Sequence, residues 1–159
     1  EWAAGLKANL ARKPQGNDRA QDKAVYEGEC DVAVGNTYYM GKMVTNQKKP
    51  VQKKWAASVN VIFPNQGDRG AHVNVSGAGV TAHAKNKANA VKLIEFLSDD
   101  AAQKIYAEKN FEYPVKAGVA IHPIVASWST FKADKESLAK IANQRTLASR
   151  LVDQVAFNK

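Results

Sequence analysis

Apolar residues recur every three or four positions in several stretches of the chain, the spacing that places them on one face of a helix. Capping residues strengthen the pattern: Asp18, Ser98 and Asn143 each stand where a helix would begin, and Gly28 stands where one would end. The predicted helices cover residues 2–10, 18–28, 39–44, 87–97, 98–106, 138–142 and 143–155, the last with an apolar face of Leu147, Leu151 and Val155. Ala102, Ile105 and Tyr106 are expected to face inward. The polar, basic segment 47–54 around Pro50 reads as a loop.

Short runs of β-branched and aromatic residues lie between these helices and predict strands at 32–34, 59–63, 72–75 and 80–82. Residues 32–34 are continuously apolar, which is typical of a strand buried on both faces of a parallel sheet. Helices alternating with such strands predict an α/β fold. Gly35 and Asn36 end the first strand, and Asn is a favoured residue at a helix start.

Two adjacent tyrosines, Tyr38 and Tyr39, would then lie just beyond the carboxyl edge of the sheet, where α/β proteins bind ligands. At the start of a helix, two phenol oxygens can converge on one ion. A phenol becomes a good ligand only when a highly charged cation replaces its proton, and anionic oxygens suit a hard trivalent ion such as Fe3+. From the dipeptide alone, the alternative is that one tyrosine packs in the core and the other lies on the surface.

Composition excludes several classes of protein. The chain has 159 residues, 45% of them hydrophobic, so it is long enough and apolar enough to fold around a core. Its net charge of +8 comes from scattered lysines and arginines without an aromatic-rich basic stripe, which favours a solvated surface over a nucleic-acid interface. Cys30 is the only cysteine, and the three histidines match no metal-binding spacing. No catalytic motif is present, so an enzyme is not expected.

Four segments resemble the periplasmic ferric-iron-binding proteins, the substrate-binding components of bacterial Fe3+ ABC importers. The most specific is Gly28–Tyr39 with its Asn-x-Tyr-Tyr element, followed by Gly70–Val80 with Ser-Gly-x-Gly-Val, which follows Phe63–Gln66. Gly5–Arg12 and the helical segment Asn89–Ser98 are also similar, so the resemblance covers nearly the whole chain.

The resemblance implies a two-lobed, type II-like periplasmic binding protein, represented by a partial chain with parts of both lobes. Residues 1–69 would belong to the second lobe, and residues 70–159 would hold a hinge strand and part of the first. Tyr38 and Tyr39 would bind Fe3+ with a synergistic anion such as carbonate or phosphate. Asn36 would contact that anion or serve as an ordinary helix cap, and Arg19 would lie near the cleft.

The same resemblance implies a periplasmic protein, monomeric at full length, that delivers iron to an ABC permease without entering the membrane. Full-length relatives are about twice as long, so an N-terminal portion with further ligands is expected to be missing, and this chain alone should bind iron weakly. Two rival functions remain open. One is binding of another small anion or organic ligand, and the other is a basic nucleic-acid-binding module.

Overall fold

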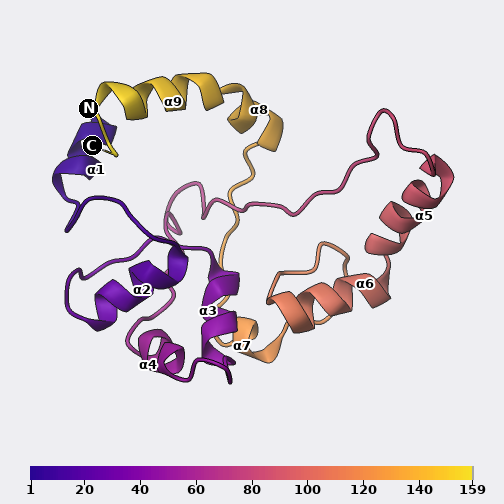
Figure 1. Cartoon of the computed structure of the whole chain (residues 1–159), viewed down its shortest axis with the longest axis horizontal. Coiled ribbons are helices and arrows are strands. Elements are labelled where there is room, and N and C mark those ends of the chain that lie inside the picture. The colour runs from indigo at the N-terminus through magenta and orange to yellow at the C-terminus, as the bar shows by residue number, and fades with distance from the viewer. Residues whose placement is uncertain (159) are drawn as a thin grey trace.

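The computed structural model describes residues 1–158, which form short helices joined by long extended segments in an open arrangement (Figure 1). The helices are α1 (Trp2–Ala8), α2 (Asp18–Tyr26), α3 (Thr37–Val44), α4 (Val51–Ala57), α5 (Lys87–Leu97), α6 (Asp100–Ile105), the π-helical turn η1 (Tyr106–Asn110), α7 (Pro123–Ala126), α8 (Leu138–Asn143) and α9 (Arg145–Gln154). The predicted helices are therefore confirmed in type and approximate position.

The starts of three helices differ from the prediction by one residue. Asn17, not Asp18, caps α2, where its side-chain oxygen accepts a hydrogen bond from the backbone N–H of Ala20 at 3.2 Å. Asp99 precedes α6 in place of Ser98, and Gln144 precedes α9 in place of Asn143. When two neighbouring residues can both cap a helix, only one of them occupies the N-cap position. The local backbone conformation determines which one it is.

The prediction of a loop at residues 47–54 is wrong, because α4 occupies Val51–Ala57. Pro50 stands at the start of this helix, where its missing N–H costs no intrahelical hydrogen bond and its fixed φ suits the first turn. The segment turns one face to the core, since Gln52 and Ala56 are buried while Lys54 is exposed.

The core of the first half lies where α2, α3 and α4 pack together (Figure 1). Met43 is fully buried, and Met40 and Ala56 are buried beside it. The partly buried Trp55 and Trp128 pack against this cluster. The packing fixes the orientation of α3, the helix on which the tyrosine pair lies.

The four predicted strands are wrong for the described chain, because residues 1–158 contain no strand longer than a single bridge. The predicted buried strand at 32–34 is extended and solvent-exposed, with Val32 at 80% and Val34 at 88% exposure, and Ile62 of the second predicted strand is 83% exposed. Strands are stabilised by hydrogen bonds to neighbouring strands. No backbone hydrogen bond among the described residues joins these segments to another strand.

One parallel bridge joins Ala71 to Ala133, two segments far apart in sequence. The Ala71 N–H donates to the Lys132 carbonyl at 2.9 Å, and the Asp134 N–H donates to the Ala71 carbonyl at 2.8 Å. Gly70 makes this approach possible, because its φ is +99° and a Cβ there would lie 2.6 Å from the Lys132 carbonyl oxygen. The bridge falls where the predicted lobe boundary lies, and the boundary itself stays a prediction.

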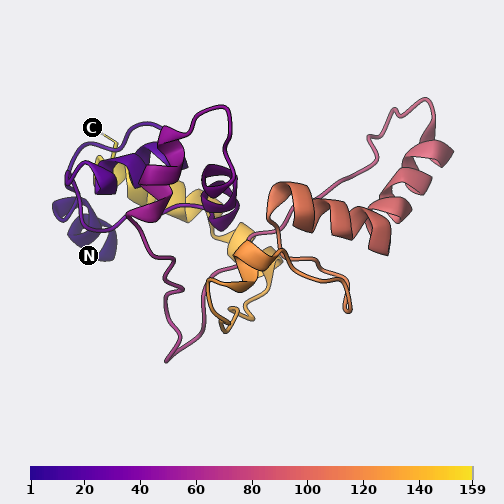
Figure 2. The same cartoon turned by 90° about the horizontal axis from the view of Figure 1, so that it is seen from below.

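The two ends of the described chain lie side by side (Figure 1). The Lys7 ammonium on α1 donates to the carbonyls of Val155 and Ala156, just after α9, at 2.9 and 2.7 Å. At the opposite side, α5 and α6 project away from the core (Figure 2).

Several apolar side chains expected to face inward are exposed. Ile105 on α6 is 54% exposed, which corrects that expectation, while Ala102 is buried as predicted. Leu147 and Leu151 on the apolar face of α9 are also exposed. The described residues include no helix that is both long and apolar enough to cross a membrane.

Candidate metal site

The two tyrosines predicted as ligands lie together in the first turn of α3, directly after the Gly35–Asn36 pair. Their ring centroids are 4.5 Å apart and their planes meet at 41°. The ring contact places the two tyrosine side chains next to each other at the start of the helix. Neither ring is sealed in the core, since both side chains are only partly buried. The arrangement offers two oxygen donors to one ion.

The surroundings hold the Tyr38 phenol in its neutral form. The neighbouring Tyr39 side chain raises the pKa of Tyr38 above its ordinary value, and desolvation and the carboxylates of Asp18 and Glu112 raise it further. Without a metal, the negative charges of Asp18 and Glu112 therefore oppose ionisation of the Tyr38 phenol. The same charges would favour a multivalent cation that displaced the phenol proton.

Two cationic side chains lie over the tyrosine rings. The Arg19 guanidinium carbon is 4.9 Å from the centroid of Tyr39. The Lys42 ammonium is 5.2 Å from the centroid of Tyr38 and 5.9 Å from that of Tyr39. Cations at this distance from an aromatic face are attracted by its electron density. The Arg19 Nε is buried and has no hydrogen-bond partner among the described residues.

Asn36 makes a contact that the sequence analysis did not anticipate. Its backbone N–H and its side-chain Nδ2 both donate to Oδ1 of Asp18, at 2.7 and 3.0 Å. Asn36 stands at the start of α3, yet its side chain makes no capping hydrogen bond to that helix. The contact ties the start of α2 to the start of α3.

Glu112 comes to the site from a segment about seventy residues further along the chain than the tyrosines. Its carboxylate accepts a hydrogen bond from Ser76 Oγ at 2.9 Å and another from Asn110 Nδ2. Nearby, Phe111 packs against α3, because a Cβ on Gly41 would lie 2.3 Å from the Phe111 ring. The turn after η1 is thus held directly against the tyrosine helix.

Three charged neighbours of the tyrosine pair were missed in the sequence analysis: Asp18, Lys42 and Glu112. Lys42 was predictable, since it lies four residues after Tyr38 and three after Tyr39 on one helix. Asp18 was considered only as a helix cap, and Glu112 not at all, because their proximity depends on the tertiary fold.

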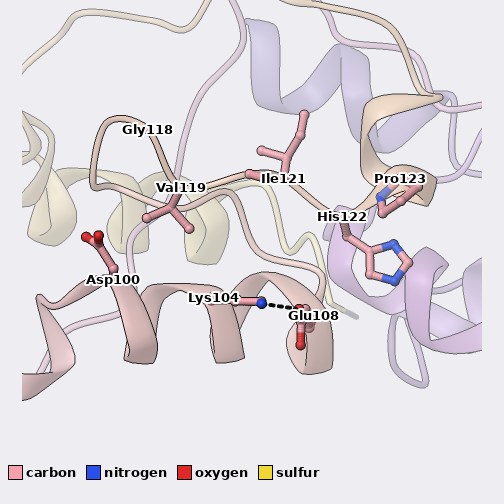
Figure 3. Close-up of a pocket in the computed structure, with 9 residues that line it drawn as sticks. Asp100, Lys104, Glu108, Gly118, Val119, Ile121, His122 and Pro123 are labelled. Atoms are coloured by element: carbon pink, nitrogen blue, oxygen red, sulfur yellow. Dashed lines mark ion pairs between the residues drawn. The ribbon is translucent and has the colours of Figure 1, made fainter.

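A cavity in the described chain lies elsewhere, between α6, η1 and the segment 118–123 (Figure 3), with a volume of about 460 Å³. Its charged residues already have partners: Lys104 pairs with Glu108 at 3.7 Å, and Asp100 pairs with Lys116 at 2.7 Å. His122 Nδ1 accepts a hydrogen bond from the Ile124 N–H at the start of α7, a structural role. Among the described residues, no three His, Cys, Asp or Glu side chains form a metal site.

Known proteins match this chain over nearly its whole length. Iron uptake protein A1 of Synechocystis sp. is 47% identical over 98% of this chain and 43% of its own length. The crystal structure of apo ferric ion-binding protein A of Pasteurella haemolytica is 52% identical, with a TM-score of 0.94 over 99% of this chain and 49% of that chain. The structure of Trichodesmium IdiA (FutA), in complex with iron and citrate, is 42% identical, with a TM-score of 0.92. The match covers 98% of this chain and 49% of that chain.

The chain spans about half the length of the relatives it matches. The structural likeness confirms the expected fold class, a partial chain of a type II-like periplasmic binding protein. The sequence model of the family of bacterial extracellular solute-binding proteins matches residues 5–104, which is well over half of the chain. The chain therefore belongs to the family of bacterial extracellular solute-binding proteins.

Proposed function

We propose that the protein binds Fe3+ in the periplasm through the phenolates of Tyr38 and Tyr39 and delivers it to an ABC importer. The single observation that supports this most strongly is the contact between the two tyrosine rings in the first turn of α3. Relatives named iron uptake protein and major ferric iron-binding protein support the choice of ion. The protein sequesters and hands over its cargo, with no chemical turnover.

Charge balance sets what else the site needs. Two phenolates offset two of the three charges of Fe3+, so a further anionic donor is required. A synergistic anion such as carbonate or phosphate, held near Asn36 and Arg19, is the sequence-based prediction. Asn36 already donates two hydrogen bonds to Asp18, so an anion held at Asn36 would have to share these donors with the Asp18 carboxylate.

The remainder of the full-length protein completes the site in this proposal. Residues 1–69 and 70–159 belong to different lobes, which close around the metal by a hinge motion. The exposed extended segments, such as residues 32–34, pair with strands outside this chain. The missing N-terminal portion supplies further ligands, an ABC permease accepts the closed form, and the full-length protein acts as a monomer.

The test is a titration of the full-length protein with Fe3+, in which visible absorption and released protons are recorded together. A tyrosine binds a metal as its phenolate, so each of the two side chains gives up a proton when the metal binds. We expect a visible phenolate-to-iron absorption band and release of about two protons per iron from this pair. Below the phenol pKa each proton competes with the metal, so the dissociation constant should rise by up to about 100-fold per pH unit of acidification.

Rival functions give different results in the same experiment. Tight binding of an oxyanion or organic ligand, with no visible band when Fe3+ is added, would support the first rival and contradict the iron proposal. Binding to DNA or RNA that weakens steeply with salt would support the second. Fe3+ binding whose affinity does not change between neutral and acidic pH would contradict phenolate ligation.

A further inference from the structure

The lysines of this protein are spread along the chain, but its acidic residues are not. Between Asp31 and Asp68 the sequence has five lysines and no aspartate or glutamate. Residues 85–112 also have five lysines, yet five acidic residues in the same segment balance them. Residues 32–67 therefore carry five of the eight net positive charges of the chain.

Four of the lysines in residues 32–67 lie on α4 and on the loop that precedes it, along the lower edge of the molecule in Figure 1. We call this set the basic patch: Lys48, Lys49, Lys53 and Lys54. None of the four forms an ion pair among the described residues. The Lys53 ammonium donates to the neutral side chain of Gln47 at 3.3 Å, and the other three lysines are exposed.

The helices packed against α4 do not neutralise the basic patch. The helix α3 has no acidic residue. On α2, Lys23 lies 2.8 Å from Glu27, the residue that ends the helix, and Asp18 accepts hydrogen bonds from Asn36. Asp22 forms no ion pair in the described part of the chain. A surface that carries one sign of charge attracts ions and surfaces of the opposite sign.

The residue types of the patch suit a diffuse anionic surface better than one fixed protein partner. Protein–protein interfaces are enriched in arginine and depleted of lysine, and the chain has no arginine between Arg19 and Arg69. Lysine is a compact charge on a flexible apolar stem, so it adapts to headgroups that move. Two exposed valines flank the loop, Val44 at 37% and Val51 at 47% exposure, and offer apolar contact at the same level.

We propose that the basic patch docks this protein on an anionic lipid membrane, which it contacts at the level of the headgroups. The described residues include no helix able to cross a membrane, so the contact is peripheral. The tyrosine pair lies in the first turn of α3 and the patch follows its last turn, which separates them by about 12 Å along the helix. A membrane held at the patch therefore leaves the tyrosines uncovered. Docking at the patch does not depend on iron binding.

The experiment measures binding of the full-length protein to vesicles by co-sedimentation. One set of vesicles is an equimolar mixture of phosphatidylglycerol and phosphatidylcholine, and the other is phosphatidylcholine alone. The wild type should bind the first set and not the second, and its binding should weaken as salt is raised. Each lysine near an anionic membrane strengthens binding by about fivefold. Replacing all four by glutamine should therefore weaken binding by at least about tenfold.

The matched control replaces four lysines of the balanced segment 85–112 by glutamine: Lys85, Lys87, Lys92 and Lys109. They lie on α5, just before it, and on η1, and their loss lowers the net charge of the protein by the same amount. This variant should bind the anionic vesicles within about twofold of the wild type, and both variants should keep the wild-type Fe3+ affinity.

Three results would overturn the proposal. The first is a wild-type protein that does not bind the anionic vesicles even at low salt, a result that needs no variant to fold. The second is an equal loss of binding in the two quadruple variants, which would show that only the net charge matters. The third is binding to soluble polyglutamate as tight as to the anionic vesicles, which would favour an acidic protein partner over lipid.

Discussion

Replacing Tyr38 and Tyr39 together by phenylalanine should abolish the visible iron band of the full-length protein. It should also weaken Fe3+ binding by well over the roughly 10–100-fold that follows loss of a residue supporting a metal ligand. The substitution removes only the two hydroxyl groups of neighbouring rings at the start of α3. The rings keep their 4.5 Å contact and their cationic neighbours, so folding should be little affected. Each single variant should retain part of the band.

Tyr26→Phe is the control for this pair, because Tyr26 is an exposed tyrosine at the end of α2 and lies outside the site. It should keep the affinity and the band of the wild type. A double variant with wild-type affinity would show that the metal is bound elsewhere. Loss of affinity in Tyr26→Phe as well would point to a general effect of removing a tyrosine hydroxyl.

Replacing Gly41 by alanine should lower the stability of the protein by about 1–3 kcal/mol, the usual effect of overfilling a packed core. Gly41 lies in α3, and an added Cβ would lie 2.3 Å from Cγ of Phe111, a buried side chain held by backbone with φ of +60°. The helix must then move away from the turn after η1. Denaturant unfolding should show the loss, and the Fe3+ affinity should fall because Tyr38 and Tyr39 move with α3.

Gly5→Ala is the matched substitution for this prediction. Gly5 also lies inside a helix, α1, and a Cβ there would meet no atom within 4 Å. Alanine is favoured over glycine in helices by about 1 kcal/mol, so Gly5→Ala should be neutral or stabilising. Equal stability of the two variants would mean that the contact between Gly41 and Phe111 does not restrict α3.

The helices were predictable from the sequence because their signals are local. The repeat of apolar residues and a capping residue lie within one segment, as in α2 and α8, whose caps Asn17 and Ser137 accept backbone hydrogen bonds. The helix α4 was missed because the polar, basic segment around Pro50 was interpreted as a loop, although proline also starts helices. The predicted strand at 32–34 failed for a different reason. A strand depends on its neighbours, and no backbone hydrogen bond among the described residues pairs that segment with another.

The candidate site was predictable only in its local part. The order Asn36, Tyr38, Tyr39 along the chain places the phenols at a helix start, and in the structure the two rings are in contact there. Their role as ligands stays a prediction. The roles of Asn36 and Arg19 toward an anion stay predictions. The hydrogen bonds from Asn36 to Asp18, and the approach of Glu112, join segments that are eighteen or more residues apart. Only the fold brings these segments together, so no sequence motif marks them.

In the proposed site, two adjacent phenolates bind one Fe3+ ion at the start of α3. Anomalous diffraction from crystals of the iron-loaded, full-length protein tests it most directly, because it locates the metal independently of any assumed ligand. The account predicts one strong iron peak at bonding distance from both the Tyr38 and Tyr39 oxygens. An iron peak that touches only one of these oxygens, or neither, would contradict it.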